Sequence, residues 1–219
     1  QQVLAHSFAL KPARARRRGL KSTSIARRLN SLRSFWKFVR DNEYTDRDPF
    51  LRISIPKRPR KLPVYLTAAE CQRLLQAAEC QRSIFHAFRD RAVLSVLIFT
   101  GLRRSELLSL KTTSVDLGAA MLRVTEGKGK KDRVLPLPER AVDALADWLE
   151  LRPKCNHEYL FTHPNGTRLS RKALAGILKR AVKRAGIEGK HVTLHTLRHT
   201  FACLMLQSGC DIFSLSRFL

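Results

Sequence analysis

The sequence predicts a mainly α-helical protein with one small antiparallel β-sheet. Most of its 219 residues fall in segments whose apolar side chains recur every three or four positions, as in helices that bury one face. A single pair of short alternating segments flanks a glycine-rich stretch, which predicts one β-hairpin. A basic, proline-rich segment near residue 60 predicts a boundary between two domains, and the chain is long enough for both.

The first domain, residues 1–55, is predicted to be helical and only partly represented. Residues 22–40 have helical periodicity, and either Ser22 or Ser24 is expected to be the N-cap. One amphipathic helix cannot bury its apolar stripe alone, so the domain needs further partners. The stripe consists of Ile25, Leu29, Leu32, Trp36 and Val39, and the flanking basic residues are Arg27, Arg28, Arg33, Lys37 and Arg40.

Two basic segments flank this helix. Arg14 to Arg18, with Lys11 and Lys21, form a cluster that is either a solvated loop or a phosphate contact. Residues 56–63 contain three prolines and four basic residues. Proline excludes a helix and keeps the chain extended, so this segment is either a plain linker or a basic strap against a polyanion. It leads into the second domain, residues 64–219.

The second domain is predicted to be mostly helical. Thr67 and Glu70 have the spacing of a capping box at a helix start. Residues 82–99 are nearly continuously apolar in their second half, which predicts a buried central helix ending at Gly101. Another helix follows at once, so Arg103 stands at the break. Further helices are predicted at 139–151, at 170–185 (capped by Ser170 and ended by Gly186), from His195 to Gly209, and at 211–219.

The hairpin is predicted from residues 121–126 and 131–137. Both segments alternate apolar and polar side chains, and the residues between them include two glycines. Lys128 lies between those glycines and is therefore expected at the tip of the hairpin.

Charge separates this chain from an ordinary globular protein. Lys and Arg number 42 against 18 Asp and Glu, a formal net charge of +24, and no acidic residue precedes Asp41. Such a chain repels itself unless its partner is a polyanion, with nucleic acid the first candidate and an anionic membrane surface the second. The longest apolar run, Ala92 to Thr100, is too short to span a bilayer, and Gln1 to Leu10 do not form a signal peptide. The five cysteines are odd in number and lack C-x-x-C spacing, so we expect free intracellular thiols.

Four side chains at predicted breaks and turns suit phosphodiester chemistry without a metal ion. Arg103 lies at a helix break, Lys128 at a hairpin tip, and His195 and Arg198 at a helix start. Guanidinium groups can stabilise negative charge on the non-bridging oxygens of a phosphate. A lysine can protonate the leaving oxygen, because nearby cations lower its pKa from about 10.4. An imidazole can transfer a proton at neutral pH.

Three segments resemble the signatures of tyrosine site-specific recombinases, in particular the Xer-type and mobile-element integrases. Their order and spacing agree with that family across residues 22–219. The segments are Thr100-Gly101-Leu102-Arg103-Arg104-Ser105-Glu106-Leu107, Gly127-Lys128-Gly129-x-Lys131-x-Arg133, and His195-x-x-Arg198-His199-x-Phe201-Ala202.

The resemblance implies a role for each residue of the site. Arg103 and Arg198 would hold the scissile phosphate, and Lys128 would be the general acid for the leaving 5′ oxygen. His195 would assist proton transfer at the nucleophile, and Glu106 would support the active-site arginine. In the family a tyrosine attacks the phosphate and forms a 3′-phosphotyrosyl bond, so that strands are exchanged without ATP, a metal or another cofactor.

The resemblance also implies an architecture and partners. A helical core-binding domain and an α-rich catalytic domain would form a C-shaped clamp around double-stranded DNA that carries a specific recombination site. Other recombinase protomers would join a tetrameric synapse, without a membrane, in the cytoplasm at the nucleoid of a bacterium or on a mobile element. The expected DNA contacts are Arg14, Arg16, Arg17, Arg27, Arg28, Lys57, Arg58, Arg60, Lys130, Lys131, Arg171 and Lys172.

The sequence departs from the family pattern at its carboxyl end. The pattern continues with Gly-His and then the tyrosine, whereas this sequence ends at Leu219. Tyr44, Tyr65 and Tyr159 match no nucleophile position. We therefore expect these 219 residues to bind DNA without cleaving it, with the catalytic domain lacking its last segment.

Several other interpretations remain. The chain could be an architectural or regulatory DNA-binding protein with a recombinase-like fold, or a type IB topoisomerase. His195 and His199 have the spacing of a metal pair, but no third ligand is evident, and His199 is expected to be a structural hydrogen bonder. The basic face of residues 171–184 is either solvated or in contact with the phosphate backbone. Residues 127–130 do not form a nucleotide-binding loop, because the required glycine and Ser/Thr are missing.

Overall fold

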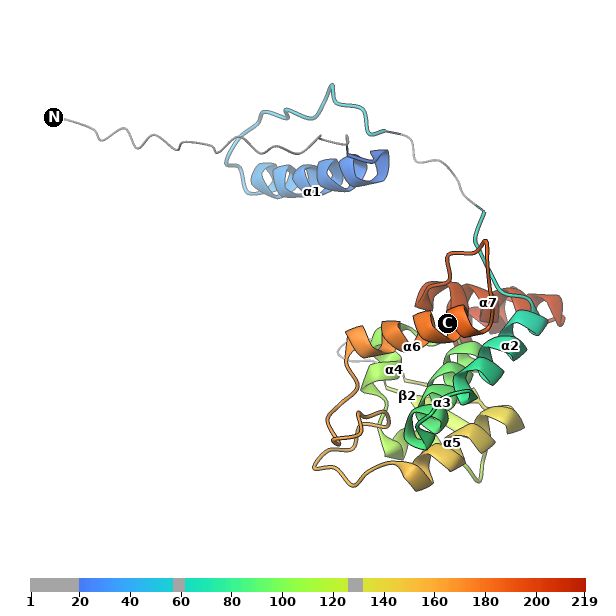
Figure 1. Ribbon diagram of the computed structural model, residues 1–219. Coiled ribbons are helices and arrows are strands. Elements are labelled where there is room, and N and C mark those ends of the chain that lie inside the picture. Colours follow the sequence, from blue (N-terminus) through green and yellow to red (C-terminus); the bar gives the residue numbers. More distant parts are fainter. Residues whose placement is uncertain (1–19, 57–61, 126–131) are drawn as a thin grey trace, which may run out of the picture. The chain divides into compact units, whose positions relative to one another are not determined.

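A computed structural model of the chain describes residues 20–56, 62–125 and 132–219 (Figure 1). The chain divides into two compact units, Gln1–Lys61 and Leu62–Leu219. Within the described residues both units are helical, apart from one three-stranded antiparallel sheet in the larger unit. The predicted fold class, mainly α with a small antiparallel sheet, is confirmed.

The smaller unit contains one long helix, α1 (Ser22–Asp41). Its N-cap is Lys21, whose carbonyl accepts hydrogen bonds from the backbone amides of Ser24 and Ile25. The prediction of a serine N-cap is therefore wrong. The chain turns into the helix one residue earlier, so Ser22 already lies inside the first turn, and no side chain caps the helix.

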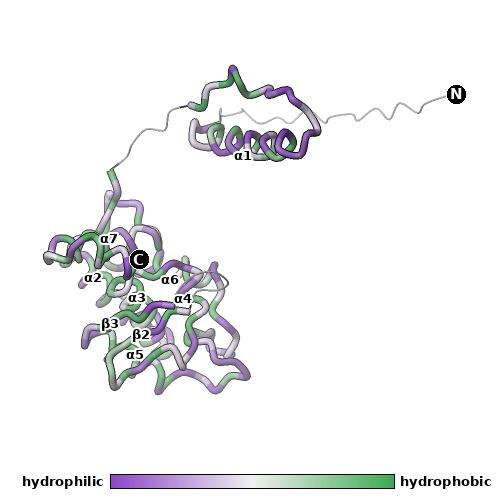
Figure 2. The backbone as a smooth tube through the Cα atoms, turned by 180° about the vertical axis from the view of Figure 1, so that it is seen from behind, coloured by the Kyte–Doolittle hydropathy of each residue, from purple (hydrophilic) through white to green (hydrophobic). Residues whose placement is uncertain are grey.

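The segment after α1 returns along the helix but covers it only in part. Trp36 donates its indole N–H to the carbonyl of Arg47 at 2.6 Å, and its ring packs edge-on against Phe50. Ala26 is the only residue of α1 that is fully buried, while Leu32 remains 50% exposed. Hydrophobic and hydrophilic residues alternate along the helix in Figure 2. This exposure agrees with the argument that one helix cannot bury the stripe.

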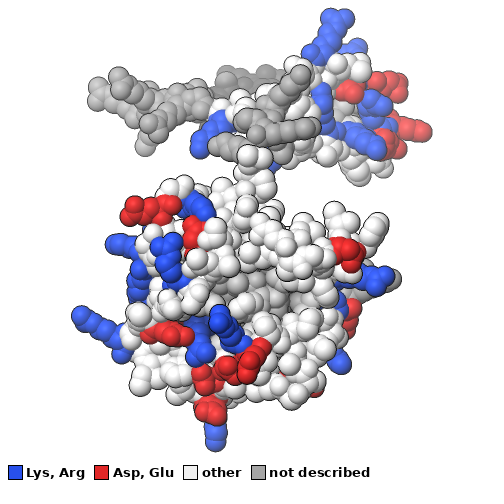
Figure 3. Space-filling view, turned by 90° about the vertical axis from the view of Figure 1, so that its right-hand side faces the viewer, with Lys and Arg blue, Asp and Glu red and all other residues white. Residues whose placement is uncertain are grey.

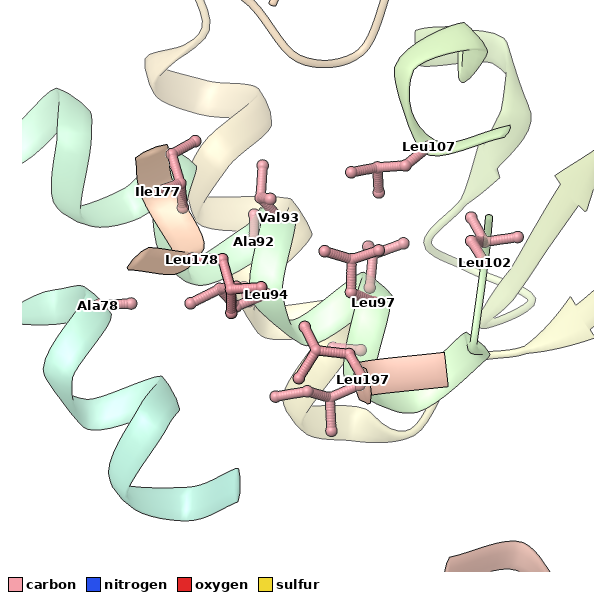
Figure 4. Packing of buried hydrophobic residues seen from close by; sticks show 14 of the residues in the cluster. Ala78, Ala92, Val93, Leu94, Leu97, Leu102, Leu107, Ile177, Leu178 and Leu197 are labelled. Carbon is pink, nitrogen blue, oxygen red and sulfur yellow. The ribbon is translucent and has the colours of Figure 1, made fainter. Parts of the chain in front are cut away.

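The larger unit is organised around α3 (Ile84–Thr100), which is buried on nearly every side. Leu94 and Leu97 of α3 lie between side chains of neighbouring elements such as Leu178 and Leu197 (Figure 4). The predicted central helix is thus confirmed. The helices packed around this core are α2 (Ala68–Glu79), α5 (Glu139–Leu151), α6 (Arg171–Arg184) and α7 (Leu194–Gln207).

Three predicted helix starts in this unit agree with the observed capping. Thr67 and Glu70 form the reciprocal bonds of a capping box at α2, and the Ser170 hydroxyl accepts from the amide of Ala173 at α6. Asp211 caps the last helix, α8 (Ile212–Phe218). These side chains satisfy amides that the first turn of a helix leaves without partners.

The predicted hairpin is confirmed in its strands. β2 (Met121–Val124) pairs with β3 (Arg133–Pro136), and Leu122 faces Leu135, both buried. A third strand, β1 (Val115–Asp116), pairs with β2 and was not predicted, because two residues are too few to show alternation. The turn with Lys128 lies outside the described residues.

One face of the larger unit carries an apolar hollow of about 830 Å³ between α2, the end of α3 and α7. Its lining includes Leu75, Phe99, Leu204 and Met205. Figure 3 shows uncharged side chains in the middle of this face and charged ones toward its edges. The basic hollows described below are separate from it.

Gly101 is the position where the backbone most clearly requires glycine. It ends α3 at φ +62°, and a Cβ atom there would lie 2.5 Å from Cδ1 of Phe201. Gly186 has nearly the same φ, +60°, but a Cβ atom there would meet no heavy atom within 4 Å. The two glycines therefore separate left-handed strain from steric clash.

We predict that Gly101→Ala destabilises the larger unit more than Gly186→Ala. Left-handed strain alone is expected to lower the free energy of unfolding by about 1–2 kcal/mol in both variants. The clash with Phe201 should add about 1–3 kcal/mol in Gly101→Ala only. Urea unfolding followed by circular dichroism measures the difference, and equal losses would contradict the predicted contact.

Candidate active site

The break between α3 and α4 (Arg104–Ser109) positions the first residue of the site. Gly101 reverses the chain, Leu102 is buried, and Arg103 follows in an extended conformation as the N-cap of α4. The amide of Arg103 donates to Oε2 of Glu106 at 2.8 Å. The predicted position of Arg103 at a helix break is confirmed, and the break fixes its backbone on both sides.

Glu106 is the centre of the cluster. Its carboxylate is nearly buried, since the residue is only 6% exposed. It accepts a hydrogen bond of 2.7 Å from Nη1 of Arg103 and one of 2.8 Å from Nη2 of Arg133. Nη1 of Arg198 lies 4.0 Å from the same carboxylate. Three arginines from three separate elements thus meet at one acid. Among the described residues of the cluster, three positive charges face one negative charge, an arrangement suited to an anion.

The start of α7 positions Arg198. Thr193 and Thr196 form the capping contacts of this helix, while Leu197 is fully buried against the core. One turn after the cap, Arg198 donates from Nη1 to the carbonyl of Gly101 at 2.9 Å and from Nη2 to the backbone oxygen of Leu219. The side chain is 15% exposed, so its guanidinium is held and still reaches the surface.

Arg133 is a member of this cluster that the sequence analysis did not assign a role. Besides its bonds to Glu106, it donates from Nε to the carbonyl of Phe218 at 3.0 Å. Arg133 pairs with Val124 in the last described pair of the hairpin ladder. It therefore connects the turn end of the paired strands, the buried acid and the end of α8. Its place in the hairpin signature was visible in the sequence, but its long-range partners were not.

His195 lies beside the cluster. It is exposed at the start of α7 and lines a hollow of about 760 Å³ together with Arg103, Lys179 and Lys190. Lys190 is held by Glu70 at 2.6 Å, and this hydrogen bond keeps the pKa of the Glu70 carboxyl below its usual value. The hollow is basic, open and next to Arg103, so it can receive an anionic backbone.

The other predicted site residues fall into three groups. Arg171 lines both hollows that Arg103 lines, and Lys172 is exposed one residue later on α6. His199 is exposed, and no hydrogen bond joins its side chain to a described residue, so its expected structural bond is not seen. Arg27 and Arg28 are exposed on α1 of the smaller unit, and the rest lie outside the described residues: Arg14, Arg16, Arg17, Lys57, Arg58, Arg60, Lys128, Lys130 and Lys131.

Comparison with known proteins decides the family. A family model described as "Phage integrase family" matches residues 64–219. This chain belongs to the phage integrase family of tyrosine recombinases. The recognition made from the three sequence signatures is confirmed, and the family consists of enzymes that break and rejoin DNA in site-specific recombination.

Curated relatives agree with this family. The tyrosine recombinase XerD of Listeria monocytogenes serotype 4b (strain F2365) is 36% identical over 211 residues, which cover 94% of this chain and 70% of the relative. XerD of Staphylococcus aureus (strain N315) is 36% identical over 199 residues, covering 89% and 66%. The chain thus spans about two thirds of the length of these recombinases.

Solved structures give the same fold. The crystal structure of XerA recombinase superposes with a TM-score of 0.67 at 35% identity, over 91% of this chain and 68% of that one. XerH bound to palindromic difH substrate in a post-cleavage complex superposes with a TM-score of 0.77 at 24% identity, over 91% and 61%. At that identity the second likeness supports the fold alone.

The described residues of the recombinase contain no group of three or more His, Cys, Asp or Glu side chains that could hold a metal ion. No helix in the same part of the chain combines the length and the hydrophobicity that crossing a bilayer requires.

We predict that Glu106→Gln lowers the free energy of unfolding far more than Glu158→Gln. Replacing Glu106 leaves arginines facing a neutral amide in a nearly buried site, which should cost about 3–5 kcal/mol. Glu158 pairs with Lys111 at 3.1 Å, but both side chains are more than half exposed, so its loss should cost at most about 1 kcal/mol. Urea unfolding measures the free energy of unfolding of the two variants. Similar decreases in both would contradict the central role of Glu106 in holding the cluster together.

Proposed function

We propose that this chain is the DNA-binding and phosphate-activating part of a site-specific recombinase that acts through a 3′-phosphotyrosyl intermediate. Arg103 and Arg198 hold the scissile phosphate, and Glu106 and Arg133 position them. Lys128 protonates the leaving 5′ oxygen, and His195 handles the proton of the nucleophile. The observation that carries the proposal is the convergence of Arg103 and Arg198 on one nearly buried carboxylate beside His195.

The chemistry follows from charge and proton balance. An attacking hydroxyl forms a bond to phosphorus as it loses a proton, and negative charge builds on the two non-bridging oxygens. Fixed guanidinium donors stabilise that charge. The bond to the 5′ oxygen breaks, and a proton from Lys128 converts the leaving oxygen to a hydroxyl. One phosphodiester replaces another, so the bond energy is retained for rejoining.

We further propose that the attacking tyrosine lies outside these 219 residues. Tyr44 is 75% exposed in the smaller unit, and Tyr159 packs under the guanidinium of Arg168 at 3.9 Å. Neither these two nor Tyr65 lines a hollow that Arg103 lines. Arg133 and Arg198 bind the backbone oxygens of Phe218 and Leu219, so a chain continuing past Leu219 would start beside the site.

The remaining parts of the proposal concern domains and partners. Residues 1–55 act as a partial core-binding domain, 56–63 as the linker and 64–219 as the catalytic domain of a clamp on duplex DNA. The chain belongs to a family that breaks and rejoins DNA in site-specific recombination, which supports DNA with a specific recombination site as the partner here. Other recombinase protomers complete a tetrameric synapse at the bacterial nucleoid or on a mobile element.

The proposed nucleophile is tested with nicked suicide duplexes that release the cleaved strand. Their arms are randomised, because the target sequence is unknown. The 219-residue chain should shift the duplexes on a native gel and form no covalent adduct on a denaturing gel. The chain together with the residues that its gene encodes after Leu219 should form an adduct, and replacing the added tyrosines with phenylalanine should abolish it.

A stop codon directly after Leu219, or an extended chain that binds duplexes without forming an adduct, would contradict this proposal. It would favour the non-catalytic DNA-binding protein instead. Relaxation of supercoiled DNA without a paired site would favour a topoisomerase.

The roles of Lys128 and Arg103 can be separated with a bridging 5′-phosphorothiolate in the same duplex. Sulfur leaves without protonation, so the lysine is needed only for the oxygen substrate. In the chain extended past Leu219, Lys128→Ala should slow cleavage of the oxygen substrate by about 10²–10⁴-fold and be rescued by sulfur. Arg103→Ala should slow both substrates by about 10²–10³-fold. Equal rescue of both variants, or of neither, would contradict the assigned roles.

A further inference from the structure

A separate basic hollow lies on the other flank of α6 from the hollow that His195 and Arg103 line. It measures about 720 Å³ and is formed by the turn between α2 and α3, the first turn of α3, His163 and α6. It shares no lining residue with the two hollows that Arg103 lines. The cluster around Glu106 therefore does not account for it.

The charge of this hollow is strongly positive. Arg82, Arg89, Arg180 and Arg184 line it, and none of its lining residues is an Asp or Glu. Asp90 lies behind the lining, only 2% exposed, and pairs with Arg89 at 2.7 Å. Four guanidinium groups against this one carboxylate leave a local net charge of +3.

Three of the four arginines remain available to a ligand. Arg89 is buried, and its donors already have protein partners: Nε and Nη2 donate to Asp90, and Nη1 donates to the carbonyl of Thr162. The Arg180 side chain is 49% exposed and only approaches Asp90, at 3.6 Å. Arg184 is exposed and makes one long bond, 3.5 Å, to the carbonyl of Ala77, and Arg82 is exposed on the turn. Each guanidinium carries five N–H donors, so most of them can face an anion.

Two further features of the hollow favour an anion. The first turn of α3 lies at this hollow, and the side chain of Ser83 makes no capping hydrogen bond. The positive end of the helix dipole therefore adds to the positive potential of the hollow. Burial, and then the charge of Arg89, lower the pKa of His86. The lowered pKa favours the neutral imidazole, which can donate one hydrogen bond to an anion without contributing charge.

We propose that this hollow binds a phosphate of the DNA backbone other than the one that is cleaved. The proposal rests on the proposed function, because it takes DNA as the partner. Arg171 and Lys179 of α6 line the hollow that Arg103 and His195 line, whereas Arg180 and Arg184 line this separate hollow. A helix with its side chains is about 10–12 Å across. One duplex lying across α6 can therefore present phosphates to both hollows.

The test removes two charges from the hollow and two from elsewhere. Arg82→Gln/Arg184→Gln is compared with Arg140→Gln/Lys154→Gln, whose residues are exposed and line none of the basic hollows. Binding of the 219-residue chain to a fluorescent duplex is titrated over a range of KCl concentrations. The hollow variant should bind several-fold more weakly at 0.15 M salt, and the negative slope of log affinity against log salt should become shallower by about 1. The control should keep both values.

Equal slopes in the hollow variant and its control would overturn the proposal. Arg82→Gln alone, which breaks no hydrogen bond to a described residue, provides a variant expected to fold normally and to lose part of the effect. Calorimetric titration with inorganic phosphate distinguishes a free anion. Phosphate binding that needs Arg82 and Arg184, combined with an unchanged DNA slope, would assign the hollow to a small anion and overturn the DNA proposal.

The outcome is distinguishable from failure of the recombinase proposal. If the extended chain forms no covalent adduct but the slope difference persists, the hollow binds DNA in a protein that is not a nuclease. If the adduct forms and the slopes are equal, the recombinase stands and the hollow does not.

Discussion

The candidate site depends on one nearly buried carboxylate. Glu106 receives Arg103 from its own helix, Arg133 from the hairpin and Arg198 at longer range from α7. Guanidinium groups repel one another, and without an acid between them these three would separate into solvent. The carboxylate cancels only one of the three charges. Among the described residues, the cluster therefore holds its geometry and presents more positive than negative charge.

The local elements could be predicted because their signals are local. Thr67 and Glu70 form the expected capping box, and Gly101 adopts the left-handed conformation that ends α3. Ser22 and Ser24 show the limit of the same reasoning. Both can cap a helix, yet the helix begins at Ser22 itself because the chain already turns at Lys21. Capping preference does not decide between neighbouring candidates when the preceding backbone can turn by itself.

The site could be predicted in its members and not in its connections. Arg103 and Arg198 stood out because they lie at helix starts within recognisable signatures. Arg133 lies in the hairpin signature, but nothing in an alternating strand shows that it reaches an acid 27 positions earlier in the chain. The basic hollow that Arg82 and Arg184 line was missed for the same reason. These two residues are more than a hundred positions apart and meet only in the folded chain. Spacing along one helix is readable from sequence, whereas convergence of separate elements is not.

The bond from Arg133 to the carbonyl of Phe218 has a mechanical consequence. The same guanidinium binds the buried carboxylate of Glu106, so it joins the last turn of α8 to the centre of the cluster. A movement of α8 must either break this bond or shift Arg133 against Glu106. Displacement of α8 and rearrangement of the cluster are therefore thermodynamically linked, and each favours the other by the same free energy.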